Sequence, residues 1–457
     1  MDLHDPDAGP LAVHFLSLGC PKNRLDTEVM IGSLALGGYA VAERVEDADV
    51  AVVNTCSFIE SAREESIQAI LDVCDRKGEG ELRAVVVAGC LPQRYANEIA
   101  NELPEVDAFV GTGDFPRLPE ILGEALAGRG GVYVEAGRTH LYDETDPRVL
   151  IGQTHTAYVK LSEGCDRVCA FCAIPGIRGP FQSRRAESLV AEARQLAAAG
   201  VREINLVAQD STSWGKDLPG RPGLDHVLRE LDAVDGLDWI RCLYLYPTAV
   251  SDALIDVLAS GKRVLPYVDV PLQHASDRLL RAMKRGTTAD RQADLVERLR
   301  SRVPGLTLRT TFIVGFPGET DADFEELCDF VRKVRFERMG VFRYSDEEGT
   351  AASGYEDKVP REVARERHRE LTRIGREIMA EQLEARVGSE AIVLVDAAEP
   401  GRAHGRMASQ APEIDGVVFL SGGEGARGVG AAAAGEMRRV RITGVRGADL
   451  DAELLAP

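Results

Sequence analysis

Three cysteines stand close together in the run Cys165-Asp-Arg-Val-Cys169-Ala-Phe171-Cys172, which has the spacing C-x3-C-x2-C. Thiols this close cannot all form unstrained disulfides with one another, and soft thiolates select zinc or iron–sulfur clusters. No histidine or fourth cysteine stands nearby to complete the closed ligand set of a structural zinc site. Three cysteines on a four-iron cluster would leave one iron open, where a substrate with an amine and a carboxylate can chelate. The run therefore predicts a catalytic four-iron cluster, with structural zinc as the alternative.

Three further cysteines, Cys20, Cys56 and Cys90, each follow a short β-branched run. These runs, at residues 12–18, 50–54 and 84–88, alternate with helical patterns near residues 25–36, 61–74 and 93–102. This order predicts a doubly wound parallel sheet with helices on both faces. Because ligand sites form beyond the carboxyl ends of such strands, the three cysteines are expected to converge on one rim and hold a metal or a cluster.

The other three cysteines, Cys74, Cys242 and Cys328, fall inside helical or strand patterns. A free cysteine in such a position is usually a small buried hydrophobe. We expect these three to pack in the core.

The periodicities divide the chain into an N-terminal α/β domain (11–128), a Gly-, Arg- and acid-rich linker (129–150), a central domain (151–383) and a small tail domain (384–457). The central domain shows six strand-and-helix units, which predict a partial (β/α)6 barrel with its chemistry at the carboxyl ends of the strands. After Pro360 the sequence is typical of one long helix. The short strand-like runs of the tail predict a small antiparallel β-barrel.

The chain has 457 residues and a net charge of -20, and residues 1–150 alone carry 12 basic and 27 acidic side chains. A polyanion would approach such a chain against a repulsive field, so nucleic acid is not expected as its substrate. No apolar run reaches the roughly 20 residues of a membrane-spanning helix. The acidic start lacks the cationic and apolar parts of a signal peptide, and nine cysteines are an odd number that cannot all pair internally. We therefore expect a cytoplasmic protein without a membrane partner.

The spacing C-x3-C-x-aromatic-C, with Phe171 as the aromatic residue, resembles the signature of the radical S-adenosylmethionine (SAM) superfamily. Within it, the chain resembles the methylthiotransferases, and most closely the branch that modifies ribosomal protein S-twelve of the small subunit. The motifs that carry the resemblance are SLGCPKNRLDTEVM (17–30), NTCSFIESAREES (54–66), IPGIRGPFQSR (174–184), LPYVDVPLQHASDRLLRAMKR (265–285), TFIVGFPGET (311–320) and APEIDG (411–416). The tail resembles the family's TRAM-like substrate-recognition barrel.

This resemblance implies two four-iron clusters, one on Cys165, Cys169 and Cys172 for SAM cleavage, and an auxiliary one on Cys20, Cys56 and Cys90 that presents sulfur. It further implies that one SAM molecule methylates a sulfur atom, while another yields a radical that removes hydrogen from the β-carbon of an aspartate. The implied partners are basic ribosomal protein S-twelve, a reductase or a ferredoxin- or flavodoxin-type electron donor, and a sulfur source. A tRNA adenosine methylthiotransferase with the same fold is the alternative, as is an enzyme with one functional cluster.

The turn after the fifth barrel strand holds Gly315, Pro317, Gly318 and Glu319, which, together with Phe171, we predict to contact the cofactor. The alternative for the turn residues is a tight strand-to-helix connection with an acid at the helix start. Weaker candidates, which could equally cap helices or form surface pairs, are Gln209, Asp210, Arg178, Ser183 and Arg184, and His274 at the end of a barrel strand could contact the substrate. The tail departs from the family at residues 428–435, where four alanines replace an expected strand and turn.

Overall fold

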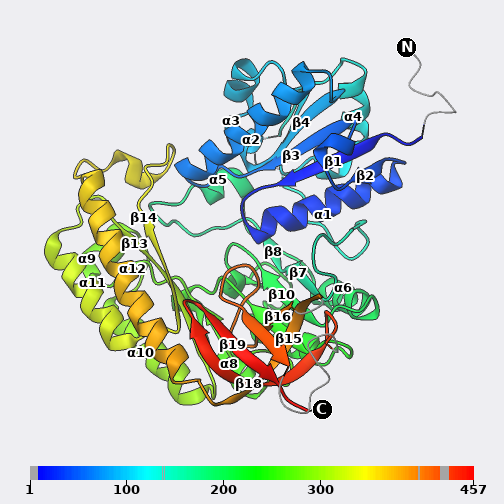
Figure 1. The fold of residues 1–457 in the computed structure, drawn as a ribbon. Helices are drawn as coiled ribbons and strands as arrows, with labels where there is room; N and C mark the ends of the chain where they lie inside the picture. The colour runs from blue at the N-terminus through cyan, green and yellow to red at the C-terminus, as the bar shows by residue number, and fades with distance from the viewer. Residues whose placement is uncertain (1–8, 136, 138, 400–401, 423–431, 457) are drawn as a thin grey trace.

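The computed structural model describes residues 9–135, 137, 139–399, 402–422 and 432–456. The chain forms an N-terminal sheet with its helices, a central half-open barrel below it, and a small β-barrel that packs against the central part (Figure 1). Among the described residues, no helix is long and apolar enough to cross a membrane.

The N-terminal sheet is entirely parallel and has the order β2-β1-β3-β4-β5-β6. Its strands are β1 (Ala12–Ser17), β2 (Ala40–Ala42), β3 (Val50–Thr55), β4 (Ala84–Gly89), β5 (Ala108–Val110) and β6 (Val132–Tyr133). Its helices are α1 (Pro21–Leu36), α2 (Glu60–Gly78), α3 (Cys90–Glu102) and α4 (Leu118–Leu126). Strand β6 lies in the segment 129–150 that was predicted as a linker, and it pairs with β5, so the sheet extends into this segment.

Both faces of this sheet are buried, which confirms the doubly wound arrangement. Alternate residues of a strand point to opposite faces, and Val50 and Val52 of β3 pack with α1 and α4, whereas Ala51 and Val53 pack with α2 and α3. Two apolar layers therefore hold the sheet and fix the carboxyl ends of β1, β3 and β4 side by side.

The central part contains two parallel three-stranded sheets, β11-β10-β7 and β12-β13-β14. Its strands are β7 (Thr156–Lys160), β10 (Glu203–Val207), β11 (Trp239–Cys242), β12 (Tyr267–Asp269), β13 (Thr307–Val314) and β14 (Arg338–Arg343). Its helices are α6 (Ala186–Ala198), α7 (Leu224–Asp232), α8 (Asp252–Ser260), α9 (Asp277–Ala282), α10 (Ala289–Arg302), α11 (Asp321–Val334) and α12 (Arg361–Glu384). A bridge between Ile240 and Val264 links the two sheets, and β7 and β14 are end strands, so the barrel is partial.

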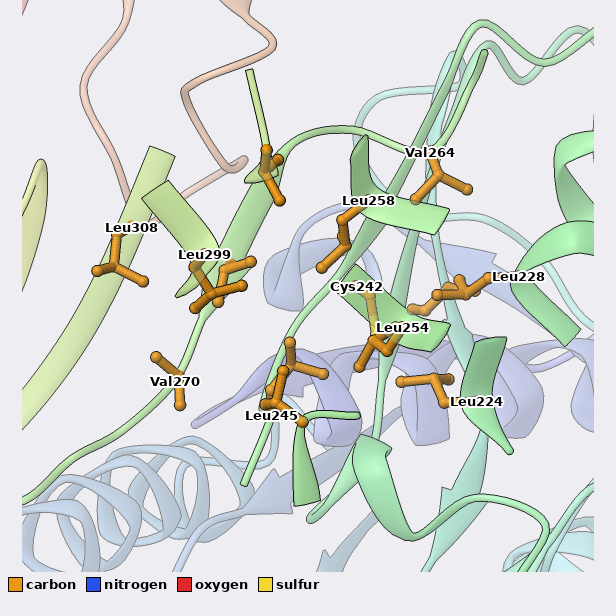
Figure 2. Close-up of a cluster of buried hydrophobic side chains, with 14 of the residues drawn as sticks. Leu224, Leu228, Cys242, Leu245, Leu254, Leu258, Val264, Val270, Leu299 and Leu308 are labelled. Atoms are coloured by element: carbon orange, nitrogen blue, oxygen red, sulfur yellow. The ribbon is translucent and has the colours of Figure 1, made fainter. Parts of the chain in front are cut away.

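The core of the partial barrel lies between its strands and the surrounding helices. Figure 2 shows leucines of α7, α8 and α10 gathered around Cys242, Val264 and Val270. Full burial of one such side chain is worth about 2 kcal/mol. The predicted packing role of Cys74, Cys242 and Cys328 is confirmed, since they are buried within apolar clusters.

The tail forms a closed barrel in the order β15-β16-β17-β19-β18. Its strands are β15 (Glu390–Glu399), β16 (Arg402–Met407), β17 (Val418–Gly422), β18 (Met437–Arg446) and β19 (Asp449–Leu454). The barrel was predicted, but its strands are not all antiparallel, because β17 and β19 pair in parallel. Register shifts in β15 and β18 bend these long strands, which helps the sheet to close.

The Ala-rich stretch that departs from the family lies partly outside the described residues, which exclude 428–431. Of the rest, Ala432 packs in the barrel core, and the Gly435 backbone N–H donates to the Val395 carbonyl at 2.8 Å. This end of the stretch is thus tied to β15.

Candidate functional site

Cys20, Cys56 and Cys90 lie at the carboxyl ends of β1, β3 and β4, which are neighbours in the sheet. Cys20 precedes α1, Cys56 follows β3 directly, and Cys90 begins α3. The three thiols interact electrostatically with one another. The structure therefore brings the predicted auxiliary triad to one rim of the sheet.

Glycines allow the backbone to turn sharply before two of these cysteines. Gly19 and Gly89 have φ angles of 89° and 99°, a region that disfavours other residues. A Cβ atom on Gly19 would lie 2.7 Å from the Cβ of Cys56, and one on Gly89 would lie 2.3 Å from Asn54 Oδ1. Only glycine fits at these two positions, so they hold the cysteine loops close together.

Cys165, Cys169 and Cys172 lie on the loop between β8 (Ser162–Glu163) and α5 (Ile174–Arg178), just beyond the end of β7. The Ala170 N–H donates to the Met283 carbonyl at 3.0 Å, and the Ala170 carbonyl accepts from the Ala352 N–H at 2.8 Å. Segments far apart in the sequence thus fix this loop at the mouth of the partial barrel. Phe171 is half-buried against the apolar cluster that includes Met283 and Phe316.

Burial makes several of these thiols weakly acidic. It raises the pKa of Cys90 and of Cys172 to about 12, and it also raises the pKa of Cys56 and of Cys165. Such thiols are protonated near pH 7, and a metal cluster that binds them must release those protons.

Each triad contains a thiol that accepts a hydrogen bond from a buried arginine. Arg178 Nη2 lies 3.3 Å from Cys90 Sγ, and Arg285 Nη1 lies 3.2 Å from Cys169 Sγ. Arg285 also donates to the Pro271 carbonyl and lies over the Tyr246 ring. Hydrogen bonds to cysteine sulfurs tune the reduction potential of iron–sulfur clusters. Each arginine would act in this way on a cluster held by its triad.

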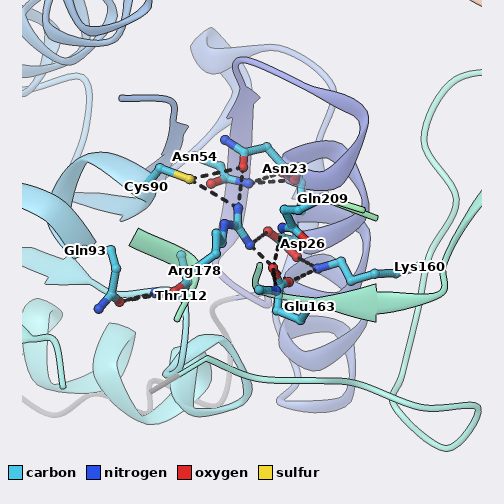
Figure 3. Close-up of polar contacts among 12 residues, drawn as sticks. Asn23, Asp26, Asn54, Cys90, Gln93, Thr112, Lys160, Glu163, Arg178 and Gln209 are labelled. Carbon is cyan, nitrogen blue, oxygen red and sulfur yellow. Dashed lines mark hydrogen bonds and ion pairs between the residues drawn. The ribbon is translucent and has the colours of Figure 1, made fainter. Parts of the chain in front are cut away.

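Arg178 belongs to a buried network that joins the N-terminal sheet to the central barrel (Figure 3). Arg178 and Lys160 share the carboxylates of Asp26, on α1, and Glu163. Burial alone would raise the pKa of Glu163, but Lys160 and Arg178 lower it to about 2. Gln209 Nε2 also donates to Glu163 at 2.6 Å, so the network reaches the end of β10.

The donor set fits an iron–sulfur cluster better than a single ion. In the described part of the chain, no three His, Cys, Asp or Glu side chains are arranged to hold one metal ion. A structural zinc ion needs four ligands around one point, whereas a four-iron cluster distributes its cysteines over different iron atoms. Two sets of three thiols, without such a single-ion arrangement among the described residues, suit the cluster.

The turn after β13 has the features of a tight connection. Gly315 and Gly318 have φ angles of 73° and 80°. Buried Glu319 accepts from the Gly315 N–H, lies 3.4 Å from His274 Nε2 and 3.3 Å from Arg367 Nη1. These contacts explain the burial of Glu319 without a bound ligand. That this turn, including Pro317, contacts a cofactor therefore stays a prediction.

The weaker candidates separate into two groups. Arg178 and Gln209 face the network between the two domains. The others have partners within the barrel: Arg184 pairs with Glu192, Ser183 receives an N–H from Gly215, and Asp210 pairs with Arg167. His274 is buried against Glu319 and accepts from the Ser276 N–H.

Lys22 is a residue that sequence reasoning missed. It lies at the start of α1, two residues after Cys20, and its Nζ is 3.3 Å from the centre of the Tyr244 ring at the end of β11. Tyr244 has a φ angle of 63° and is held by an N–H donated to Asp269 Oδ2 at 3.0 Å. The run Cys20-Pro21-Lys22 was visible, but only the fold shows that its lysine points at the barrel.

Three known protein families match consecutive parts of the chain, in the same order as the three domains of its fold. Residues 12–111 match an uncharacterized protein family, UPF0004, residues 159–331 match the radical SAM superfamily, and residues 387–455 match the TRAM domain.

The chain also resembles curated proteins over nearly its whole length. It is 49% identical to the ribosomal protein uS12 methylthiotransferase RimO of Anaeromyxobacter sp. (strain K), over 97% of this chain and 93% of that protein. It is 45% identical to the protein of the same name from Geobacter sulfurreducens, over 97% of this chain and 98% of that protein.

Solved structures show the same fold at low identity. The radical SAM methyltransferase TsrM from Kitasatospora setae aligns with a TM-score of 0.53 and 17% identity, covering 86% of this chain and 79% of that chain. The cobalamin-dependent SAM radical enzyme OxsB aligns with a TM-score of 0.51 and 12% identity, covering 79% of this chain and 56% of that chain.

The partial barrel, its cysteine loop and the family match define a radical SAM enzyme, a class that uses a four-iron cluster and SAM. The N-terminal sheet and the closed C-terminal barrel are the additional parts that this chain shares with its curated relatives over 97% of its length. The chain belongs to the family of the ribosomal protein uS12 methylthiotransferases.

Proposed function

We propose that this enzyme attaches a methylthio group to the β-carbon of an aspartate in ribosomal protein uS12. The observation that carries the proposal is the match to uS12 methylthiotransferases at 45–49% identity over 97% of the chain. The two cysteine triads, which lie on parts of the chain joined by Arg178, support it.

Cys165, Cys169 and Cys172 would hold the cluster at which SAM is cleaved, and Cys20, Cys56 and Cys90 would hold a second four-iron cluster. When bound, these groups and SAM supply methyl transfer to sulfur and a radical that removes hydrogen from an unactivated carbon. Phe171 and the turn of Gly315, Pro317, Gly318 and Glu319 would contact SAM.

The chain's own residues contribute placement and protection. The Lys160, Asp26, Glu163 and Arg178 network fixes the auxiliary triad relative to the barrel through buried contacts of 2.6–3.3 Å. Its two cations and two carboxylates balance, so the network costs less to bury than unpaired charges would. Buried contacts of this kind would help to exclude water from a site between the two triads, which suits a radical reaction because it limits side reactions.

Charge favours a protein substrate over RNA. The net charge of -20 opposes a phosphate backbone and attracts a basic ribosomal protein. A reductase or a ferredoxin- or flavodoxin-type protein would deliver the electrons, and a separate sulfur source would supply the inserted atom. We place the reaction in the cytoplasm, where the ribosomal substrate is made.

The test is an anaerobic assay with reconstituted enzyme, SAM and a strong reductant, in which unmodified uS12 and unmodified bulk tRNA are offered separately. Mass spectrometry should find a methylthio group on one aspartate of uS12 and none on tRNA. Methylthio-adenosine in tRNA, with unmodified uS12, would overturn the proposal and assign the chain to tRNA modification.

A further inference from the structure

Lys22 is a buried cation that pairs with no carboxylate among the described residues. It is 9% exposed, and among the described residues its Nζ has no hydrogen bond or ion pair, only the face of the Tyr244 ring. Its first electrostatic partner is the Cys20 thiol of the auxiliary triad, and the two carboxylates that interact with it, Glu163 and Asp269, are already paired with other cations. Lys22 therefore supplies a surplus positive charge at the mouth of the barrel.

The fold gains little from this arrangement. A buried ammonium group without an anion costs free energy, and a cation at a helix N-terminus is opposed by the helix dipole. Lys22 is in the first turn of α1, where no acidic residue is present. The contact with the Tyr244 ring offsets only part of this cost. The site is therefore built for an anion that arrives with a ligand.

The position of Lys22 indicates which ligand this is. Cys20, two residues earlier, belongs to the proposed auxiliary triad, whereas Tyr244 follows a barrel strand. A methylthio group that moves from the auxiliary cluster to the β-carbon of an aspartate reaches a carbon bonded directly to the carboxyl carbon. The substrate carboxylate must therefore lie beside the auxiliary triad, on the side that faces the barrel, which is where Lys22 is.

We propose that Lys22 binds the side-chain carboxylate of the substrate aspartate and thereby selects this residue for modification. The inference rests on the proposed function and names the group that the site recognises. The backbone of Tyr244 is strained and is held by its hydrogen bond to Asp269. This backbone places the tyrosine ring under the ammonium group and so fixes where the substrate carboxylate would bind. Arg285 does not compete for this role, because it already donates to Cys169 and to the Pro271 carbonyl.

The test measures binding without turnover. Reconstituted enzyme with SAM but without reductant is titrated with fluorescent uS12 and with uS12 in which the target aspartate is replaced by asparagine. The wild-type enzyme should bind the aspartate form about tenfold or more tightly, as a charge-assisted hydrogen bond implies. Lys22→Met should lose this preference, with unchanged affinity for the asparagine form, and Lys22→Arg should retain part of it.

A matched control is Lys358→Met. Lys358 also lies over a tyrosine ring, that of Tyr344, but it has Asp346 as a counter-ion. Its removal should leave the preference intact. Iron content and the electron paramagnetic resonance signal of each variant show whether its clusters are assembled.

Three results with the Lys22→Met variant would overturn the inference. Lys22→Met could keep the preference for the aspartate form, or lose affinity for SAM instead, which would assign Lys22 to the carboxylate of SAM. The Lys22→Met variant could also bind both uS12 forms equally weakly and show a changed electron paramagnetic resonance signal. Lys22 would then act as a counter-charge of the cluster. If the wild-type enzyme neither binds nor modifies uS12, the proposed function itself fails, and the inference with it.

Discussion

At the residue scale, two cysteines of the N-terminal domain show how the environment of a proposed cluster ligand differs from that of a packing residue. Cys90 and Cys74 are both 7% exposed, and burial raises the pKa of both thiols. Cys90 faces Arg178, Asn23 and the other two cysteines of its triad, whereas Cys74 packs among the apolar residues beneath α2. Only Cys90 has polar partners suited to a cluster ligand.

We therefore expect Cys90→Ala, reconstituted under anaerobic conditions, to bind about four iron atoms per chain where the wild type binds about eight, since one of two four-iron clusters is lost. Cys74→Ala should retain about eight and lose roughly 1 kcal/mol of stability. Iron and acid-labile sulfide analysis of both variants decides this. About eight iron atoms in Cys90→Ala would remove this residue from the ligand set.

At the element scale, the start of α11 shows how a helix cap can anchor the turn that precedes it. The Thr320 hydroxyl accepts from the Asp323 N–H, and the Asp323 carboxylate accepts from the Thr320 N–H, which forms a capping box. Thr320 directly follows the predicted cofactor turn that ends at Glu319. The cap therefore holds both the helix and the turn.

Thr320→Ala should cost about 1 kcal/mol of stability and weaken SAM binding several-fold, because the turn loses its anchor. Thr288→Ala is the matched control, since Thr288 caps a different helix, α10, by accepting from the Arg291 N–H. It should cost a similar amount of stability but leave SAM affinity unchanged. Equal SAM affinity in both variants would show that the turn is only a connection.

At this level of helices and strands, most of the fold could be predicted from the sequence. The strands before Cys20, Cys56 and Cys90 were visible because β-branched runs end at each cysteine, and parallel topology then places those ends together. The six units of the barrel and the helix after Pro360 followed from periodicity alone. The parallel pairing of β17 with β19 was missed, because strand direction depends on contacts between segments that local patterns do not encode.

The contacts between domains could not be predicted from the sequence either. Lys160 meets Asp26 across 134 residues of sequence, and Lys22 meets Tyr244 across the same boundary. Each of these residues alone reads as an ordinary charged or aromatic side chain. Their pairing depends on how the N-terminal sheet docks on the barrel, which only the three-dimensional structure supplies.

At the scale of the whole molecule, a second buried network ties the C-terminal barrel to the central part. Arg406 pairs with Asp396 at 2.8 Å and with Glu203, at the start of β10, at 2.6 Å. His155 Nε2 lies 3.0 Å from Asp396 Oδ1, and Arg241 reaches Glu203 at 3.1 Å. The network links the C-terminal barrel to strands β10 and β11 of the partial barrel.

Asp396 should make this docking sensitive to acid. Burial alone would raise the pKa of Asp396, but hydrogen bonds from His155 and Arg406 lower it below its ordinary value. A carboxyl group whose pKa is lower in the folded state stabilises the fold above its unfolded pKa of about 3.9, and this stability is lost as the pH falls through the folded value. Asp396→Asn should therefore lower the melting temperature at pH 6–8, by the equivalent of about 1–3 kcal/mol.

The difference between wild type and Asp396→Asn should shrink as the pH falls below about 4, because the unfolded wild-type chain then takes up a proton at this carboxylate, which the folded protein binds only at lower pH. Scanning fluorimetry of both proteins across this range measures it, with Asp290→Asn, an exposed position on α10, as the control. Because Arg406 and Glu203 remain in the variant, any weakening of uS12 binding would follow from a displaced C-terminal barrel and not from a lost substrate contact. A constant difference at all pH values would show that the network acts through packing and not through the charge of Asp396.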